Sequence, residues 1–120
     1  MPRTTLVLGA SPDPSRYAHK AVRRLRSHGH DVLAIGRHTG IIDDVPILAA
    51  VPEGAVVDTV TLYLSPRNQL VWQDEILHLR PRRVIFNPGA EDAVFAQRLE
   101  GAGIEVVEGC TLVMLSTGGY

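Results

Sequence analysis

The sequence contains short apolar runs that each end at turn-forming residues. The first run, residues 5–10, reads Thr-Leu-Val-Leu-Gly-Ala and stops at Gly9. Runs that are apolar throughout, with no alternation of polar side chains, are typical of strands buried on both faces. Such strands occur mainly in parallel sheets. Similar runs predict further strands at residues 31–36, 59–64, 82–87 and 104–107.

Between these strands, three segments have the periodicity of amphipathic helices. In residues 16–28 the apolar side chains fall on one face, and Gly29 follows as the expected residue after the helix end. Ser15 or Asp13 is the expected N-cap of this helix. Two more helices are predicted, at residues 68–79 and 91–100.

The order of these elements predicts an α/β fold. A strand, a helix and a strand within about 35 residues form a right-handed βαβ unit. We therefore expect one Rossmann-like domain over residues 1–120, with a doubly wound, mainly parallel sheet of five to six strands and helices on both faces. Residues 45–48 are a possible edge strand. Residues 110–116 are expected to lie back on the sheet, and residues 117–120 to form a tail.

Composition narrows the classes of partner. The chain has 12 basic and 13 acidic residues, a net charge of −1, and one cysteine. This balance gives no electrostatic reason to expect a nucleic acid or an anionic membrane as partner. A single cysteine excludes an internal disulfide and a multi-cysteine metal site. With no long apolar run, we expect a soluble, cytoplasmic protein.

The predicted binding site follows from the fold. In doubly wound sheets, ligands bind beyond the carboxyl ends of the strands, where the strand order reverses. The turn after the first strand also precedes a helix, and a helix N-terminus attracts anions. The candidate residues after the strands are Gly9, Ala10, Ser11, Gly36, Arg37, Leu64, Ser65, Pro66, Asn87, Pro88 and Gly89.

The first turn departs from the dinucleotide-binding fingerprint. Ser11 and Pro14 stand where a G-x-G-x-x-G sequence has its second and third glycines, which disfavours a tightly bound NAD pyrophosphate. The Ser11 hydroxyl could donate to a phosphate oxygen. Equally, Ser11 could be a local cap in a tight strand-to-helix turn. The two interpretations have similar weight on the residues alone.

Two arginines refine the prediction. Arg16 lies at the predicted helix start, where a cation opposes the helix dipole unless an anion is bound. On this residue alone, a surface arginine in a cation-rich helix is the slightly favoured interpretation. Arg37 follows the second strand, where NAD-binding domains place a carboxylate for the ribose hydroxyls. An arginine there favours a phosphorylated ribose, as in coenzyme A (CoA) or NADP. Neighbouring His38 is expected to be solvated.

Motifs for several enzyme classes are absent from the sequence. It contains no G-x-x-x-x-G-K-[ST] loop and no G-x-S-x-G nucleophile elbow, and its five histidines lack metal-ligand spacing. Cys110 has no obvious catalytic partner and is interpreted as a buried core cysteine. Trp72 is interpreted as a packing or interface residue. No catalytic or metal-binding residues are therefore predicted.

These residues together resemble the small bacterial CoA-binding domain proteins, which are similar to the N-terminal CoA-binding domain of the succinyl-CoA synthetase α subunit. The resemblance runs from Thr4 to about Thr117. Many members have Asn-Pro-Lys after the second strand, where this chain has Gly36-Arg37-His38. The segments that carry the resemblance are Leu8-Gly9-Ala10-Ser11-Pro12, Val32-Leu33-Ala34-Ile35-Gly36-Arg37, Val60-Thr61-Leu62-Tyr63-Leu64-Ser65-Pro66 and Val84-Ile85-Phe86-Asn87-Pro88-Gly89.

The resemblance implies that CoA lies across the strand ends. Gly9, Ala10 and Ser11 would hold the pyrophosphate with Arg16 nearby, Pro12 would also belong to the cofactor site, and Arg37 would take the 3′-phosphate side of the nucleotide. Ser65 and Pro66 would border the adenine or the pantetheine arm, and residues 87–89 the thiol end. The phosphorylated histidine of the synthetase lies in a separate domain, so its ligase activity is not implied here.

The expected function is therefore the binding of CoA or an acyl-CoA, without chemistry by this chain alone. An NADP-linked enzyme, or a CoA-thiol reaction at Cys110, is an alternative from another class. A Rossmann-like scaffold that has lost its ligand and serves only protein contacts is a third. Trp72, Tyr63 and the apolar segment near the C-terminus could support a homodimer or another protein partner.

Overall fold

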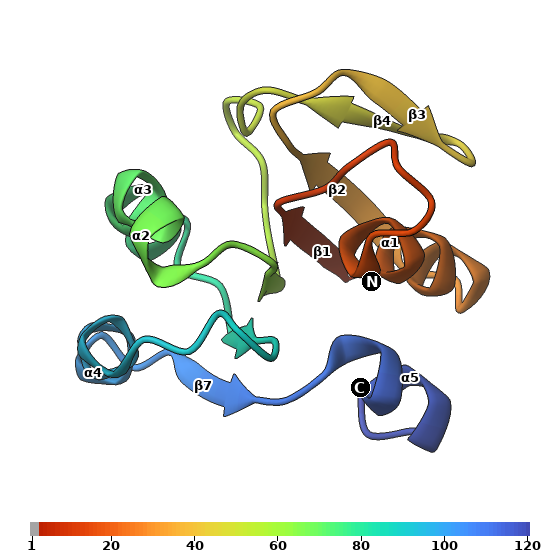
Figure 1. Cartoon of the computed structure of the whole chain (residues 1–120). Helices are drawn as coiled ribbons and strands as arrows, with labels where there is room; N and C mark the ends of the chain where they lie inside the picture. The colour runs from red at the N-terminus through yellow and green to blue at the C-terminus, as the bar shows by residue number, and fades with distance from the viewer. Residues whose placement is uncertain (1–2) are drawn as a thin grey trace.

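The computed structural model describes residues 3–120 and contains one sheet in that range (Figure 1). The sheet has seven strands in the order β3-β4-β2-β1-β5-β6-β7. All neighbouring strands pair in parallel except β3 and β4, which are antiparallel. The strands are β1 (Thr4–Leu8), β2 (Asp31–Ile35), β3 (Gly40–Ile42), β4 (Val45–Leu48), β5 (Thr59–Leu62), β6 (Arg83–Phe86) and β7 (Glu105–Glu108).

Helices cover both faces of this sheet, as the apolar runs predicted. α1 and α5 share one apolar cluster with β1, β2 and β4, while α3 and α4 pack on the opposite face. Within residues 3–120, no helix is long and apolar enough to cross a membrane. The helices are α1 (Tyr17–Ser27), α2 (Pro66–Gln69), the 3₁₀ helix η1 (Leu70–Trp72), α3 (Gln73–Leu79), α4 (Ala93–Gly101) and α5 (Thr111–Thr117).

The sheet has more strands than the five to six predicted from the sequence. The candidate edge strand at residues 45–48 is β4, and β3 adds a short outer strand joined to it by the turn Asp43-Asp44. Arg26 of α1 donates to both carboxylate oxygens of Asp44, at 3.0 and 2.6 Å. A three-residue edge strand with one buried side chain has too little apolar periodicity to be predicted from sequence.

The start of α1 differs from the prediction. Arg16 occupies the N-cap position, and no side chain caps the helix. The Asp13 carboxylate instead accepts from the N–H and the hydroxyl of Ser15, at 2.9 and 2.8 Å. Those two bonds lower the pKa of Asp13, with Arg16 and His19 contributing less. The predicted caps therefore stabilise the preceding turn, and the first amides of α1 are left without a side-chain acceptor.

Two later segments also differ. The helix expected at residues 68–79 begins earlier, with Ser65 as N-cap of α2, and it is interrupted by η1 before α3. The apolar segment at residues 110–116 lies back on the sheet as expected, where it forms α5 and packs against α1 and the strands. The expected tail folds back, since Tyr120 packs against the same cluster. The aromatic ring of Tyr120 makes this contact, and the Gly-rich residues before it give no sign of the contact in the sequence.

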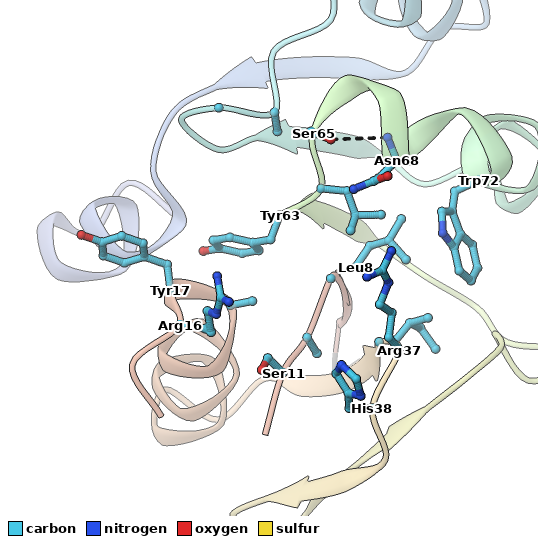
Figure 2. Close-up of a pocket in the computed structure, with 18 of the residues that line it drawn as sticks. Leu8, Ser11, Arg16, Tyr17, Arg37, His38, Tyr63, Ser65, Asn68 and Trp72 are labelled. Atoms are coloured by element: carbon cyan, nitrogen blue, oxygen red, sulfur yellow. Dashed lines mark hydrogen bonds between the residues drawn. The ribbon is translucent and has the colours of Figure 1, made fainter. Parts of the chain in front are cut away.

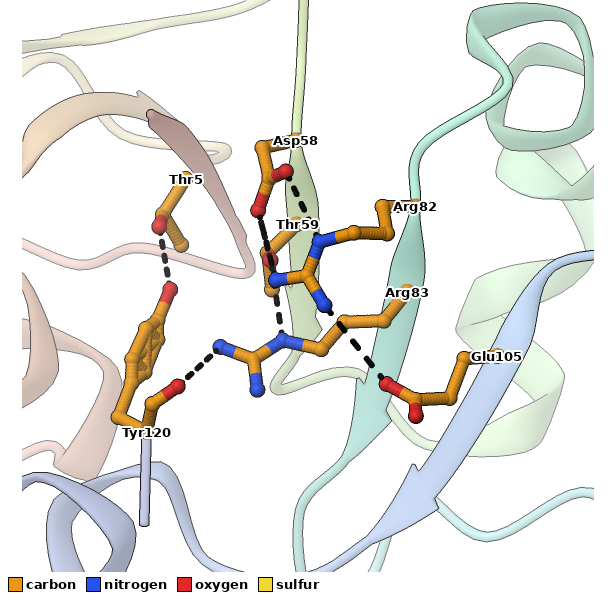
Figure 3. A network of polar contacts seen from close by, with 7 residues as sticks. All are labelled: Thr5, Asp58, Thr59, Arg82, Arg83, Glu105 and Tyr120. Carbon is orange, nitrogen blue, oxygen red and sulfur yellow. Dashed lines mark hydrogen bonds and ion pairs between the residues drawn. The ribbon is translucent and has the colours of Figure 1, made fainter. Parts of the chain in front are cut away.

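A network of hydrogen bonds and ion pairs connects residues at the edge of the sheet where β1, β5 and β6 begin (Figure 3). Asp58 accepts from Nε and Nη2 of Arg82, at 3.1 and 3.2 Å. Burial works against the ionised Asp58 carboxylate, but hydrogen bonds from Arg82 and Thr59 prevail and lower its pKa. Arg83 donates to Thr59 Oγ1 at 3.1 Å. The opposite edge, where the strands end, is left open for the site described next.

Candidate functional site

A cleft of about 790 Å³ opens at the carboxyl ends of the central strands (Figure 2). The cleft lies at the end of β1, which pairs with β2 on one side and with β5 on the other, so the strand order reverses direction at this point. This reversal of direction separates the two connecting loops and leaves a crevice between them. Ten of the predicted site residues line it: Gly9, Ala10, Ser11, Arg16, Gly36, Arg37, Leu64, Ser65, Pro88 and Gly89.

Close approach of three loops shapes the bottom of the cleft. A β-carbon at Gly36 would lie 2.0 Å from the carbonyl oxygen of Ala10, so only glycine fits there. Gly9 has φ +102°, and a β-carbon on it would lie 3.0 Å from the Tyr63 carbonyl oxygen. These two glycines therefore allow the loops after β1, β2 and β5 to pack backbone against backbone.

The main-chain amides of the first loop are largely engaged. The N–H groups of Gly9 and Ala10 both donate to the Ile35 carbonyl, at 2.9 and 2.8 Å. Ser11 Oγ accepts from the Asp13 N–H at 3.1 Å, an acceptor role that leaves its hydroxyl hydrogen available. Ser11, and not the two preceding amides, is thus the group of this turn that can offer a donor to a ligand.

The N-terminus of α1 adds positive potential to the same wall. Arg16, Tyr17 and Ala18 line the cleft, and the first turn of this eleven-residue helix contains no acidic side chain. Uncapped amides and the helix dipole favour an anion at this position. Arg16 Nε lies 3.8 Å from Asp13 Oδ2, but both side chains are more than half exposed, so this ion pair is weak.

Basic side chains surround the opening. Arg16, Arg37, Arg67 and His38 line the cleft, and no aspartate or glutamate of the described chain does so. Within residues 3–120, Arg37 and Arg67 form no ion pair. Arg67 and His38 were not predicted as site residues. Their position directly beside Pro66 and Arg37 is the sequence signal that could have found them.

Two apolar side chains on η1 line the opposite side of the cleft. Trp72 is half-buried, packs against the core and also lines the cleft, where the sequence predicted a packing or interface residue. Val71 beside it is 84% exposed. In Figure 2, Ser65, Asn68 and Trp72 lie across the opening from Ser11 and His38. The α1 side of the cleft is therefore basic, and the α2–η1 side combines the apolar Val71 and Trp72 with Arg67 and the polar Ser65 and Asn68.

Three predicted site residues do not line the cleft: Pro12, Pro66 and Asn87. Asn87 is 2% exposed and holds β5, β6 and α5 together. Its Nδ2 donates to Thr61 Oγ1 and the Leu62 carbonyl, at 2.7 and 2.9 Å, and its Oδ1 accepts from the Thr111 N–H at 2.9 Å. The Asn87 side chain has a structural role here, while Pro88 and Gly89 reach the cleft.

Tyr63 and Cys110 differ in their position relative to the cleft. Tyr63 lines the cleft, and burial raises the pKa of its phenol to about 12. Thr111 and Thr61, whose hydroxyls bond to each other at 2.7 Å, lower this pKa but do not outweigh burial. Cys110 is half-exposed and does not line the cleft, so the prediction of a buried core cysteine is wrong. Among the described residues, no cluster of histidine, cysteine or carboxylate side chains could hold a metal.

Solved structures share this architecture over the whole chain. One, described as a crystal structure of an uncharacterized protein, is 48% identical with a TM-score of 0.94, covering 100% of this chain and 99% of that one. A Thermus thermophilus protein is 30% identical with a TM-score of 0.87, covering 99% and 91%. A hypothetical protein from Pyrococcus horikoshii OT3, at 19% identity and a TM-score of 0.85 over 94% and 81%, shares the fold.

The sequence itself also matches a described family. No match was found among curated proteins. Residues 3–116, nearly the whole chain, match the family described as CoA binding domain. That range includes every strand of the described sheet and every residue that lines the cleft. The chain therefore belongs to the CoA-binding domain family.

Proposed function

We propose that this protein binds coenzyme A or an acyl-CoA in the cleft and performs no chemistry by itself. The observation that carries the proposal is the cleft lining, which has three arginines and no carboxylate among the described residues. Family membership gives the ligand class. CoA carries a pyrophosphate and a 3′-phosphate, so a site of this charge fits it well.

The ligand's orientation follows from the two walls. The 3′-phosphate would meet Arg37, and the pyrophosphate would meet Ser11, Arg16 and the start of α1. The pantetheine arm would run along the apolar side, with the thiol end toward Pro88 and Gly89. The Ser11 hydroxyl, the exposed Arg16 and the unpaired Arg37, together with the apolar side chains Val71 and Trp72 on η1, support this direction.

The competing functions have less support. NADP shares a ribose phosphate, and Arg37 by itself would suit it equally well. A thiol reaction at Cys110 is disfavoured because that side chain does not line the cleft. A scaffold without ligand would have no need of two unpaired arginines at a cleft of this size. One titration series separates these possibilities.

The experiment is calorimetric titration of the purified protein with CoA, acetyl-CoA, NADP, NAD and ATP at low and moderate salt. We expect binding of the two CoA compounds, weaker at higher salt because charge contributes. Arg37→Ala should weaken CoA binding about tenfold or more, and Ser11→Ala less, since one charged group contributes more than one hydroxyl.

The matched control is Arg24→Ala, which removes an exposed arginine of α1 outside the cleft. It should leave CoA affinity unchanged. Tighter binding of NADP than of CoA would replace the proposed ligand by NADP. Absence of heat from all five compounds would overturn the nucleotide proposal and favour the scaffold.

A further inference from the structure

Gln69 is a fully buried polar residue beside the cleft. Its exposed fraction is 0%, and it lies at the end of α2. Its Nε2 donates to the Leu64 carbonyl at 2.8 Å and to the Ala90 carbonyl at 2.6 Å. Leu64 follows β5 and Ala90 follows β6, and both residues line the cleft. One side chain thus links the two loops that form the far half of the opening.

The contacts fix the direction of the amide. Both acceptors are carbonyl oxygens, so the NH₂ group must face them. Oε1 is then directed elsewhere, and no donor within residues 3–120 bonds to it. An apolar side chain of similar size would fill the same space without an unpaired acceptor. The carboxamide is therefore explained by its two bonds to the loops and not by core packing.

A second carboxamide, that of Asn87, connects the same two strands, β5 and β6, at a different place. Asn87 donates to the Leu62 carbonyl on β5 and accepts from the Thr111 N–H on α5. That bond network lies away from the cleft, whereas Gln69 holds residues that line it. Gln69 is consequently the one of the two whose bonds set the spacing between cleft-lining residues 64 and 90.

We infer that Gln69 is a positioning residue for the pantetheine arm: by holding the Leu64 and Ala90 loops together, it sets the width of the cleft half that this arm occupies. The inference rests on the proposed function, since it takes CoA as the ligand with its nucleotide end at Arg37. It predicts that loss of Gln69 impairs binding of the arm and spares binding of the nucleotide.

The test compares two ligands on three proteins. Calorimetry gives Kd for CoA and for adenosine 3′,5′-bisphosphate, which lacks the pantetheine arm, on wild type, Gln69→Met and Gln97→Met. Methionine keeps the side-chain length and removes the donors, and Gln97 is an exposed glutamine of α4 that serves as matched control. Gln69→Met should weaken CoA about tenfold and the bisphosphate less than about twofold, with Gln97→Met unchanged.

The outcomes are distinct. An equal loss of affinity for both ligands, or no loss for either, overturns the inference and leaves the proposed function intact. Wild-type protein that binds neither ligand overturns the proposed function, and this inference with it. A loss confined to CoA supports both.

A measurement on the wild type covers the case in which Gln69→Met does not fold. The side-chain N–H resonances of Gln69 in ¹⁵N-labelled protein should shift on addition of CoA and stay in place with adenosine 3′,5′-bisphosphate. Resonances that stay unchanged at saturating CoA, or that respond equally to both ligands, overturn the inference.

Discussion

The Arg83 guanidinium lies 4.4 Å from the centre of the Tyr120 ring, and its Nη2 donates to the Tyr120 carbonyl at 3.0 Å. Arg83 is only 6% exposed, and no aspartate or glutamate within residues 3–120 forms an ion pair with it. Tyr120 also bonds through its hydroxyl to Thr5. Tyr120 thus covers the buried guanidinium of Arg83 and connects it to β1 through Thr5, at the sheet edge opposite the cleft (Figure 3).

Tyr120→Ala should therefore destabilise the fold and spare the cleft. We expect urea unfolding to show a loss of about 1–3 kcal/mol, from ring burial and cation–π attraction. The control is Tyr17→Ala, whose side chain is 68% exposed and should change stability by less than about 0.5 kcal/mol. Equal stability of the two variants would contradict the role given to Tyr120.

Gly36→Ala should disturb both the fold and the site. The added β-carbon would lie 2.0 Å from the Ala10 carbonyl oxygen, so the two loops must separate. We expect unfolding free energy to fall by about 1–3 kcal/mol, with weaker CoA binding in calorimetry. Gly101→Ala is the control, because a β-carbon there has nothing within 4 Å. If Gly36→Ala matched this control in stability, the close approach would be refuted.

Tyr63→Phe should change the response to alkaline pH. The folded-state pKa of about 12 lies above the ordinary value of 10 because the phenol is buried. A raised pKa means that its contribution to stability is complete below pH 10 and is lost as pH rises towards 12. The wild type should lose up to about 2–3 kcal/mol more than Tyr63→Phe over this window. Urea midpoints measured from pH 9 to 12 check this, and parallel curves would contradict it.

Trp72 should report ligand binding directly. It is the single tryptophan of the chain, and it lines the cleft half-buried. Because its surroundings change when an apolar arm packs beside it, CoA should alter its fluorescence in a saturable way. Arg37→Ala should move the titration to about tenfold higher concentration, as expected for loss of a charged contact. A signal unchanged at CoA concentrations that give calorimetric heat would place the ligand away from η1.

Much of the architecture could be predicted because it depends on local patterns. Runs of apolar residues, such as Leu6-Val7-Leu8 in β1, are typical of strands buried between two layers of helices. The turn at Gly9 and the basic pair Arg16 and Arg37 followed from their places after strands and before a helix. Since parallel strands all end at one edge of the sheet, the position of the cleft needed no knowledge of side-chain contacts.

Other features depend on partners that are distant in the sequence. Asn87 follows a strand end like the other candidates, but its side chain turns inward to Thr61 and Thr111. Trp72 has the pattern of a packing residue, and Arg67 that of a surface cation, yet both line the cleft. No local sequence pattern shows whether such a side chain points into the cleft or into the core.

The sequence by itself determined the fold class, the edge of the sheet where the cleft opens and two of the arginines that line it. Backbone propensity and apolar periodicity act over a few residues, and these features require no more. Only the tertiary structure decided that Ile35 engages the Gly9 and Ala10 amides and that Gln69 joins the loops after β5 and β6. Such pairings arise when the strands associate, because hydrogen-bond partners far apart in the chain are selected by geometry and burial rather than by neighbouring residues.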